Sequence, residues 1–319
     1  MITIRRILFP TDFSRCANQA FAHAVQIAKR HGAELHVLHA YVPYEDHTSL
    51  LTTASLAPEV KPGATILTPP MLQVLEAEQA QSLPITQMVI RDISTGPVIL
   101  DYATEHDIDL IVMGTHGRRG IGHLFLGSVA EEVVRFAPCP VFTIKETREP
   151  HRASAFRKIL VPVDFSKNSE QAVRCAKELA TLYGAELQLL HIVEEQLHPA
   201  MYATGRSSIF EFMPEIEITS AKEIERMLKA SGGPDVAAEI HIREGRASRD
   251  IVRFAESHGS DLIVIATHGL SGIEHLLLGS VTEKVVRFAR VPVFTVKTFG
   301  KSLIGLKEVQ HHETTALHA

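Results

Sequence analysis

Apolar and polar positions follow one another along the chain in the way expected of strands that lead into helices. Residues 4–9 form a short apolar run that ends at Pro10, and Ser14 stands where a helix N-cap is expected. Apolar residues then recur at helical spacing over residues 17–28, and Gly32 is typical of a helix C-terminus. The first 32 residues therefore predict a strand followed by a helix.

The same alternation continues to residue 145. Strands are predicted at 34–42, 85–91, 110–113 and 141–145, and helices at 70–82, 95–106 and 128–136. This order predicts an α/β fold with a parallel sheet, right-handed crossovers and helices on both faces. Two long connections, 43–69 and 194–217, interrupt the pattern and are typical of lids, interfaces or disordered segments.

The whole pattern occurs twice. Residues 5–14 read RRILFPTDFS and residues 157–166 read RKILVPVDFS, an offset of 152 residues. At the same offset, residues 109–145 and 261–297 are identical at 26 of 37 positions. The chain is therefore predicted to hold two copies of one domain, joined by the polar linker 146–152.

Composition narrows the class of protein. The net charge of −5 gives no footprint for nucleic acid. The three cysteines, Cys16, Cys139 and Cys175, have no metal-ligand spacing and suit a reducing cytoplasm. No stretch approaches the roughly 18 apolar residues that span a bilayer. The sequence predicts a cytoplasmic protein with no membrane insertion.

The residues that indicate chemistry follow the fourth strand. Gly114-Thr-His-Gly117 is followed after nine residues by Gly127 and Ser128, where a helix begins. Ligands of open parallel sheets bind beyond the carboxyl ends of the strands, and a helix N-terminus suits a phosphate. Glycines would let the backbone approach a ligand and adopt positive φ. Asp12, at the end of the first strand, is expected on the opposite wall.

With this spacing and this aspartate, each half resembles the ATP-binding type of universal stress protein. The resemblance covers residues 2–145 and 155–297, and implies two Rossmann-like domains of the adenine nucleotide alpha hydrolase-like type, at 1–146 and 153–298. Each domain would have a five-stranded parallel sheet in the order 3-2-1-4-5. The C-terminal tail, residues 299–319, is predicted to be a frayed end.

The resemblance also implies the ligand and its site. The ligand would be ATP, ADP or AMP with Mg²⁺, and no metal site formed by protein side chains is expected. The first nucleotide site would consist of Pro10, Thr11, Asp12, Ala40, Met113, Gly114, His116, Gly117, Arg118, Gly127, Ser128 and Val129. The second would consist of Pro162, Val163, Asp164, Ile192, Ala266, His268, Gly269, Gly279, Ser280 and Val281.

The second half departs from the family pattern in one glycine. Ala266 takes the place of Gly114, and a Cβ would cost roughly 1–2 kcal/mol if that position needs positive φ. Leu270 and Ser271 also replace Arg118 and Arg119, two potential phosphate donors. The first half is therefore predicted to bind nucleotide more tightly.

Structural readings of the same residues stay open. The glycines could serve tight turns, and Asp12 and Asp164 could cap the turns that follow them. His39 and His191 are interpreted as core histidines, and zinc binding by the loop histidines is disfavoured. Neither a dinucleotide fingerprint nor a Walker loop fits, and no catalytic motif of a hydrolase is present, so at most weak ATPase activity is expected.

Three functions remain in competition. The first is a stress-response protein that senses or sequesters ATP. The second is a nucleotide-independent interaction or small-lipid carrier that works through its apolar connections, and the third is a slow ATP hydrolase. For the second, the relevant side chains are Leu50, Leu51, Leu56, Ile66, Leu67, Ile209, Phe210 and Phe212. The resemblance further implies that the halves mimic a family homodimer through residues 141–145 and 293–297, and that two chains associate into a homodimer.

Overall fold

Strands and helices alternate along both halves of the chain. The computed structural model describes residues 2–42, 65–117, 126–147, 156–194, 208–269, 278–297 and 300–303. The first half contains β1 (Arg6–Pro10), α1 (Arg15–His31), β2 (Glu34–Tyr41), α2 (Pro69–Ala77), β3 (Ile85–Arg91), α3 (Thr95–Glu105), β4 (Leu110–Gly114), α4 (Ser128–Phe136) and β5 (Val141–Ile144). The second half contains β6 (Lys158–Pro162), α5 (Lys167–Tyr183), β7 (Glu186–Val193), α7 (Ile209–Phe212), α8 (Glu215–Ala230), β8 (Ala238–Glu244), α9 (Ala247–Ser257), β9 (Leu262–Ala266), α10 (Ser280–Phe288) and β10 (Val293–Val296).

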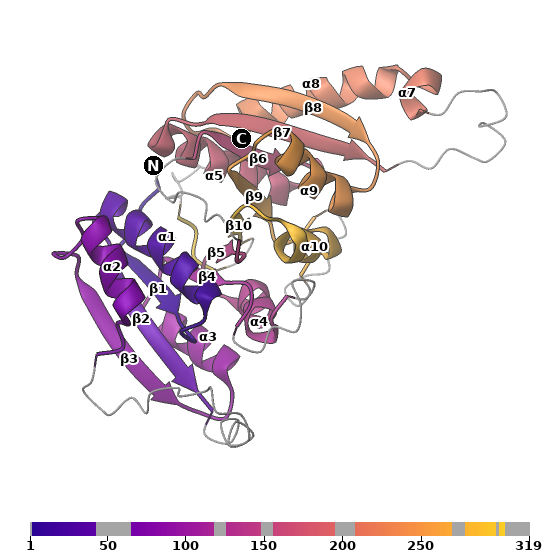
Figure 1. The fold of residues 1–319 in the computed structure, drawn as a ribbon. Coiled ribbons are helices and arrows are strands. Elements are labelled where there is room, and N and C mark those ends of the chain that lie inside the picture. Colours follow the sequence, from indigo (N-terminus) through magenta and orange to yellow (C-terminus); the bar gives the residue numbers. More distant parts are fainter. Residues whose placement is uncertain are drawn as a thin grey trace, which may run out of the picture.

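All strands of the described residues form one sheet in the order β3-β2-β1-β4-β5-β10-β9-β6-β7-β8. Within each half the neighbours are parallel and follow the order 3-2-1-4-5, which confirms the predicted fold. The halves meet where β5 lies beside β10 (Figure 1). The two strands pair antiparallel, with Phe142 opposite Phe294. The two halves therefore share a single sheet.

The first helix shows how the sequence sets an element's ends. The Ser14 hydroxyl accepts a hydrogen bond from the Ala17 N–H and caps α1. At the other end Gly32 takes the left-handed conformation, with φ 62°, and its N–H bonds the Ala28 carbonyl. Lys29 and Arg30 lie in the last turn, where positive charge favours the helix dipole.

The predicted connection at 194–217 is wrong over its last residues. Residues 209–212 form α7, and α8 begins at Glu215. The apolar residues there supplied no periodic signal because α7 is a single turn, which one buried residue, Ile209, fixes to the core. Residues 43–64 of the other long connection lie outside the described residues.

Two apolar cores cover the two faces of the sheet, and both extend through the two halves. One core lies under α1, α2, α5 and α8, and the other lies under α3, α4, α9 and α10. The inner strands are accordingly buried on both sides, as the solid apolar run of β4 predicts, whereas the edge strands β3 and β8 are only partly buried. Within the described residues, no helix has both the length and the apolar composition needed to cross a bilayer.

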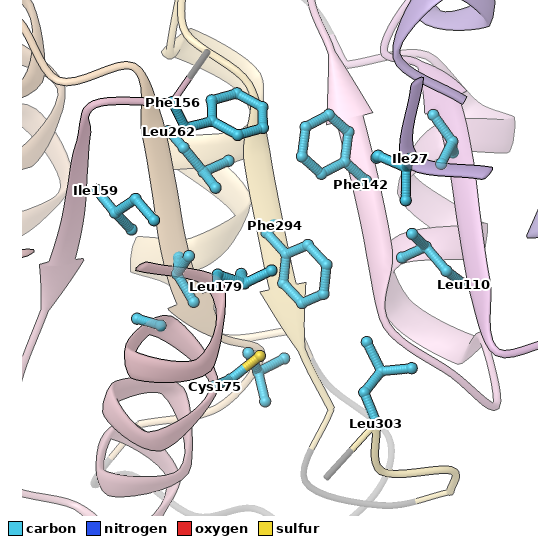
Figure 2. Close-up of a cluster of buried hydrophobic side chains, with 14 of the residues drawn as sticks. Ile27, Leu110, Phe142, Phe156, Ile159, Cys175, Leu179, Leu262, Phe294 and Leu303 are labelled. Carbon is cyan, nitrogen blue, oxygen red and sulfur yellow. The ribbon is translucent and has the colours of Figure 1, made fainter. Parts of the chain in front are cut away.

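The seam between the halves is apolar at its centre and polar at its ends. Figure 2 shows Phe142 and Phe294 facing one another across the paired strands, with ring centroids 6.2 Å apart. Each half then caps the last helix of the other with a lysine. Lys145 Nζ donates to the Arg287 carbonyl at 3.1 Å, and Lys297 Nζ donates to the Val134 and Arg135 carbonyls.

The first residues of the C-terminal tail are fastened to the first half, so the predicted frayed end is wrong for residues 300–303. The Lys301 N–H donates to the Pro138 carbonyl at 2.6 Å, and Lys301 Nζ lies 2.8 Å from Asp107 and 2.5 Å from Asp109. Leu303 is 5% exposed and joins the core beside the seam (Figure 2). This contact could not be predicted from the sequence because Lys301 and Asp107 lie 194 residues apart.

Candidate functional site

The first wall of the candidate site is the turn that follows β1. Pro10, the last residue of β1, pairs with Leu38 of β2, and the buried Thr11 donates its N–H to the Leu38 carbonyl at 2.8 Å. Asp12 then accepts the Ser14 N–H on Oδ1 at 3.0 Å. Asp12 therefore does cap its own turn, as the structural reading of the sequence held.

The second wall is the loop that leaves β4. The Thr115 N–H donates to the Ile144 carbonyl, and the Gly127 N–H donates to the Thr115 carbonyl at 2.9 Å. This last bond closes the loop and brings its end back to its start. Thr115 Oγ1 also bonds His116 Nδ1 at 2.8 Å, which holds the imidazole at the base of the loop. Arg118 lies outside the described residues.

The two walls touch at Asp12 and Gly117. A Cβ built on Gly117 would lie 2.6 Å from Asp12 Oδ2, closer than real side-chain contacts allow. One on Gly127 would lie 3.1 Å from the Thr115 carbonyl oxygen. A side chain at position 117 would displace the Asp12 carboxylate, and one at position 127 would press on the loop backbone at Thr115, so glycine favours the close approach at both positions. The structure brings these three sequence-predicted residues together.

Position 114 is a glycine for a different reason from the one predicted. Its φ is not positive, and neither is that of Gly117 or Gly127. A Cβ on Gly114 would instead meet Cys16 Sγ at 2.8 Å and the Cys16 carbonyl carbon at 3.2 Å. The first turn of α1 packs against this glycine, so the expectation that a Cβ at this position strains the backbone and weakens binding for that reason is wrong.

Helix α4 begins beside this junction. Gly127 is its N-cap, and among the described residues no side chain caps the helix. Ser128 is exposed and Val129 is half-buried. The first amides of a helix have no partner within the helix and carry its positive dipole end, which favours an anion.

The remaining first-half residues line one face of the sheet. Ala40 of β2 is half-buried, Met113 of β4 is 5% exposed, and both belong to the core under α3 and α4 together with Val129. These side chains make this face apolar at the ends of β2 and β4 and at the start of α4.

The second half repeats the arrangement. Asp164 Oδ1 accepts the Ser166 N–H at 3.1 Å, and Asp164 Oδ2 lies against Gly269. The Gly279 N–H closes the second loop on the Thr267 carbonyl at 2.9 Å. The other predicted residues occupy the equivalent places: Pro162 ends β6, Val163 follows it, Ile192 lies on β7, Ala266 ends β9, His268 bonds Thr267, and Ser280 and Val281 begin α10.

Burial shifts the pKa of two side chains beside the sites towards the uncharged form. Burial raises the pKa of the Cys16 thiol, so this cysteine is neutral and serves as packing beside Gly114. Burial lowers the pKa of His191, although the Val163 carbonyl and Asp164 act in the opposite direction. No group of three His, Cys, Asp or Glu residues within the described ranges could hold a metal ion.

Comparison with known proteins decides the family. The Universal stress protein family profile matches residues 3–145 and again 155–297. The chain belongs to the universal stress protein family.

A tandem relative spans nearly the whole chain. Universal stress protein Slr1230 of Synechocystis is 24% identical over 315 residues, covering 92% of this chain and all of that protein. A universal stress protein structure from Archaeoglobus fulgidus has a TM-score of 0.59 at 23% identity, covering 92% of this chain and 97% of its own. Both proteins therefore match this chain over nearly its full length and over nearly their own.

Two shorter universal stress protein structures were solved with adenine nucleotides. One is a complex with cAMP, 26% identical, covering 45% of this chain and 98% of its own, with a TM-score of 0.34. The other, from Archaeoglobus fulgidus, is a complex with dAMP, 24% identical, covering 44% of this chain and 98% of its own, with a TM-score of 0.33.

Sequence reasoning missed the residue that follows each aspartate. Phe13 and Phe165 have positive φ, at 63° and 64°. His39 and His191, interpreted as core histidines, each bond a backbone carbonyl beside these turns. The signal in the sequence was the repeated Asp-Phe-Ser in both halves, but a phenylalanine gives no hint of a left-handed backbone.

Proposed function

We propose that this chain binds adenine nucleotide at one site in each half and acts as a nucleotide-responsive stress protein. The observation that carries the proposal is the junction of Asp12, Gly117 and the uncapped start of α4, repeated at Asp164, Gly269 and α10. An anion-binding helix end next to a carboxylate and an apolar wall suits a phosphate, a ribose and a base together.

The residues present fit such a ligand. Gly117 lies against Asp12 and Gly127 against the Thr115 carbonyl, and neither carries a side chain, so main-chain amides would face the ligand. The amides of Ser128 and Val129 at the start of α4 would hold the phosphates, because the Gly127 N–H already donates to the Thr115 carbonyl. The backbone at Ala40 and the Asp12 turn would hold the nucleoside. Mg²⁺ would arrive on the phosphate oxygens, which it prefers, rather than through a cage of protein carboxylates.

The second half would bind the nucleotide through the equivalent residues but without the two arginines. Leu270 and Ser271 stand where the first half has Arg118 and Arg119, and all four lie outside the described residues. The prediction that the first half binds more tightly therefore rests on these side chains, since the backbone reason given for Gly114 is removed.

Titration calorimetry tests the proposal. The ligand is MgATP, with cAMP and dAMP as comparison ligands, and the proteins are the parent, Gly127→Val, Gly279→Val and the double variant. A branched side chain at either N-cap crowds the loop closure and the first amides of the helix. Each single variant should lose one of two binding events, and the double variant should lose both. The half that still binds serves as the folding control. Parent protein that binds none of these ligands would reject the proposal.

Several of the apolar side chains that suggested an interaction or small-lipid carrier are packed in the core. Ile66 and Ile209 are each 3% exposed, and Leu67, Phe210 and Phe212 pack against the core. These side chains are therefore occupied within the fold. Leu50, Leu51 and Leu56 lie outside the described residues.

The hydrolase alternative has its own test. Parent protein incubated with MgATP would release phosphate, and Gly127→Val together with Gly279→Val would abolish the release. We favour binding over hydrolysis because Asp12, the carboxylate of the candidate site, already accepts the Ser14 N–H and caps its own turn.

We further propose that the β5–β10 seam takes the place of the interface between two single-domain chains. Antiparallel pairing over residues 141–143 and 293–295, with reciprocal lysine caps, is self-complementary as a two-fold interface would be. Sedimentation of the full chain would then distinguish a monomer, which already holds a pair of domains, from the four-domain homodimer expected from the sequence.

A further inference from the structure

Two phenylalanines hold a backbone conformation that their side chains disfavour. Phe13 and Phe165 lie in the left-handed region, and they are two of the four non-glycine residues with positive φ in the described part of the chain. A residue with a Cβ is strained in this conformation, whereas glycine would adopt it without strain. The same strain at equivalent positions of two diverged halves indicates a shared purpose.

A histidine fixes each strained residue from the neighbouring strand. The Phe13 ring lies against the His39 ring, with centroids 4.5 Å apart, and His39 Nδ1 donates to the Thr11 carbonyl at 2.8 Å. Phe165 and His191 repeat this at 4.3 Å, with His191 Nδ1 donating to the Val163 carbonyl at 2.9 Å. One histidine therefore holds the chain on both sides of each aspartate. Each phenylalanine with its histidine, Phe13 with His39 and Phe165 with His191, forms a clamp.

The surrounding hydrogen bonds differ between the halves, although the clamp is the same. In the first half Thr11 Oγ1 accepts the Phe13 N–H at 3.0 Å. Val163 has no hydroxyl to offer Phe165, so that support is missing in the second half. The ring on the histidine is the feature that both turns keep. In both halves the strain is thus held by the histidine, through its ring contact and its bond to the carbonyl, rather than by the Thr11 hydroxyl.

The clamp determines where the aspartate points. Asp12 stands between Thr11 and Phe13 in the chain, with Oδ1 on the Ser14 N–H and Oδ2 against Gly117. If φ at Phe13 relaxed to a right-handed value, the peptide planes on either side would rotate. The carboxylate would then leave Gly117, and the two walls of the site would separate.

We propose that Phe13 and Phe165, held by His39 and His191, are positioning residues that set nucleotide affinity by aiming Asp12 and Asp164 at the glycine loops. This inference rests on the proposed function, because it assigns the strain to that same site. A turn that only reversed the chain would be served better by glycine, which needs no clamp at this φ. The half-buried phenylalanine is kept because its ring carries the constraint.

The experiment removes the constraint in one half while the other half is silenced. Phe13→Gly is made in the Gly279→Val background, and the equivalent variant of the other half, Phe165→Gly, is made in the Gly127→Val background. MgATP affinity is measured by calorimetry and stability by thermal unfolding. Each glycine variant should lose at least tenfold in affinity. Phe13→Tyr, which keeps the ring on His39, should restore affinity to within about twofold of the background.

A second variant covers the case in which Phe13→Gly does not fold. His39→Phe keeps an aromatic ring against Phe13 but removes the hydrogen bond to Thr11, and it should also weaken MgATP binding at least tenfold. Hydrogen exchange of the Ser14 amide, which bonds Asp12, should become faster in both variants. A merely structural role would change the unfolding midpoint and leave affinity and this exchange rate in place.

The outcomes separate the inference from the function beneath it. If the parent binds MgATP and the Phe13→Gly and His39→Phe variants bind it equally well, the positioning role is rejected and the binding function stands. If the Gly279→Val background itself binds no MgATP while Gly127→Val does, the first-half site is rejected and Phe165 alone carries the test. If the parent binds no MgATP, the proposed function fails and the inference falls with it.

Discussion

Replacing Gly114 with alanine would place a methyl group in the first turn of α1. The new Cβ would lie 2.8 Å from Cys16 Sγ, whereas ordinary contacts begin at 3.4 Å, so the sulfur must move by more than half an ångström. The Cys16 carbonyl carbon and the Ala17 nitrogen, at 3.2 and 3.3 Å, must also yield by smaller amounts. Because two of the three neighbours are backbone atoms of a helix, a rotamer change cannot relieve them.

Overpacking of this kind costs about 1–3 kcal/mol of unfolding free energy. We expect Gly114→Ala to fall in this range when parent and variant are compared by urea denaturation. Cys16→Ala removes the nearest atom, so the double variant should recover part of the loss, and a double-mutant cycle should show coupling between the two sites. The second half provides the natural precedent, since Ala266 and Asn168 replace this glycine and this cysteine.

Two results would refute this reasoning. Gly114→Ala with unchanged stability would mean that α1 does not approach β4 as described. A loss that is the same with and without the Cys16 sulfur would place the strain elsewhere. MgATP affinity of the double variant should stay near the parental value, because Gly114 has no positive φ for a Cβ to disturb.

Two further predictions concern the seam and the tail. Leu303→Ala should lower the unfolding free energy by about 2 kcal/mol, near the low end for a buried leucine, while the control Ile93→Ala, at a side chain 90% exposed, should leave it unchanged in the same denaturation assay. Burial lowers the pKa of Lys297 to about 7, so above that pH the native chain releases a proton that the unfolded chain keeps up to its ordinary pKa of 10.5. Stability of the parent should therefore rise with pH across this window by up to about 1.4 kcal/mol per unit relative to Lys297→Met, and equal slopes between pH 7.5 and 9 would contradict this.

The sequence predicted the fold because its signals are local and occur twice. Apolar runs, the Ser14 cap and the Gly32 terminus each act within a few residues, and the strand order follows from the family pattern. The pairing of Asp12 with the β4 loop was also accessible, because the carboxyl ends of parallel strands lie at one edge.

What the sequence could not supply depends on contacts between distant residues. Gly114 looked like a ligand-facing glycine, and only the position of Cys16 gives its reason. The tail looked frayed because Lys301 finds Asp107 and Asp109 only after the sheet has formed. The strain at Phe13 was hidden because phenylalanine is among the residues least expected to hold positive φ.

Amide resonances measured during a saturating MgATP titration test the central claim most directly. The account predicts that the Gly127, Ser128, Gly279 and Ser280 resonances shift, while that of Gly32, at the opposite end of α1, stays in place. Resonances at the starts of α4 and α10 that remain unmoved, with or without shifts elsewhere, would contradict it.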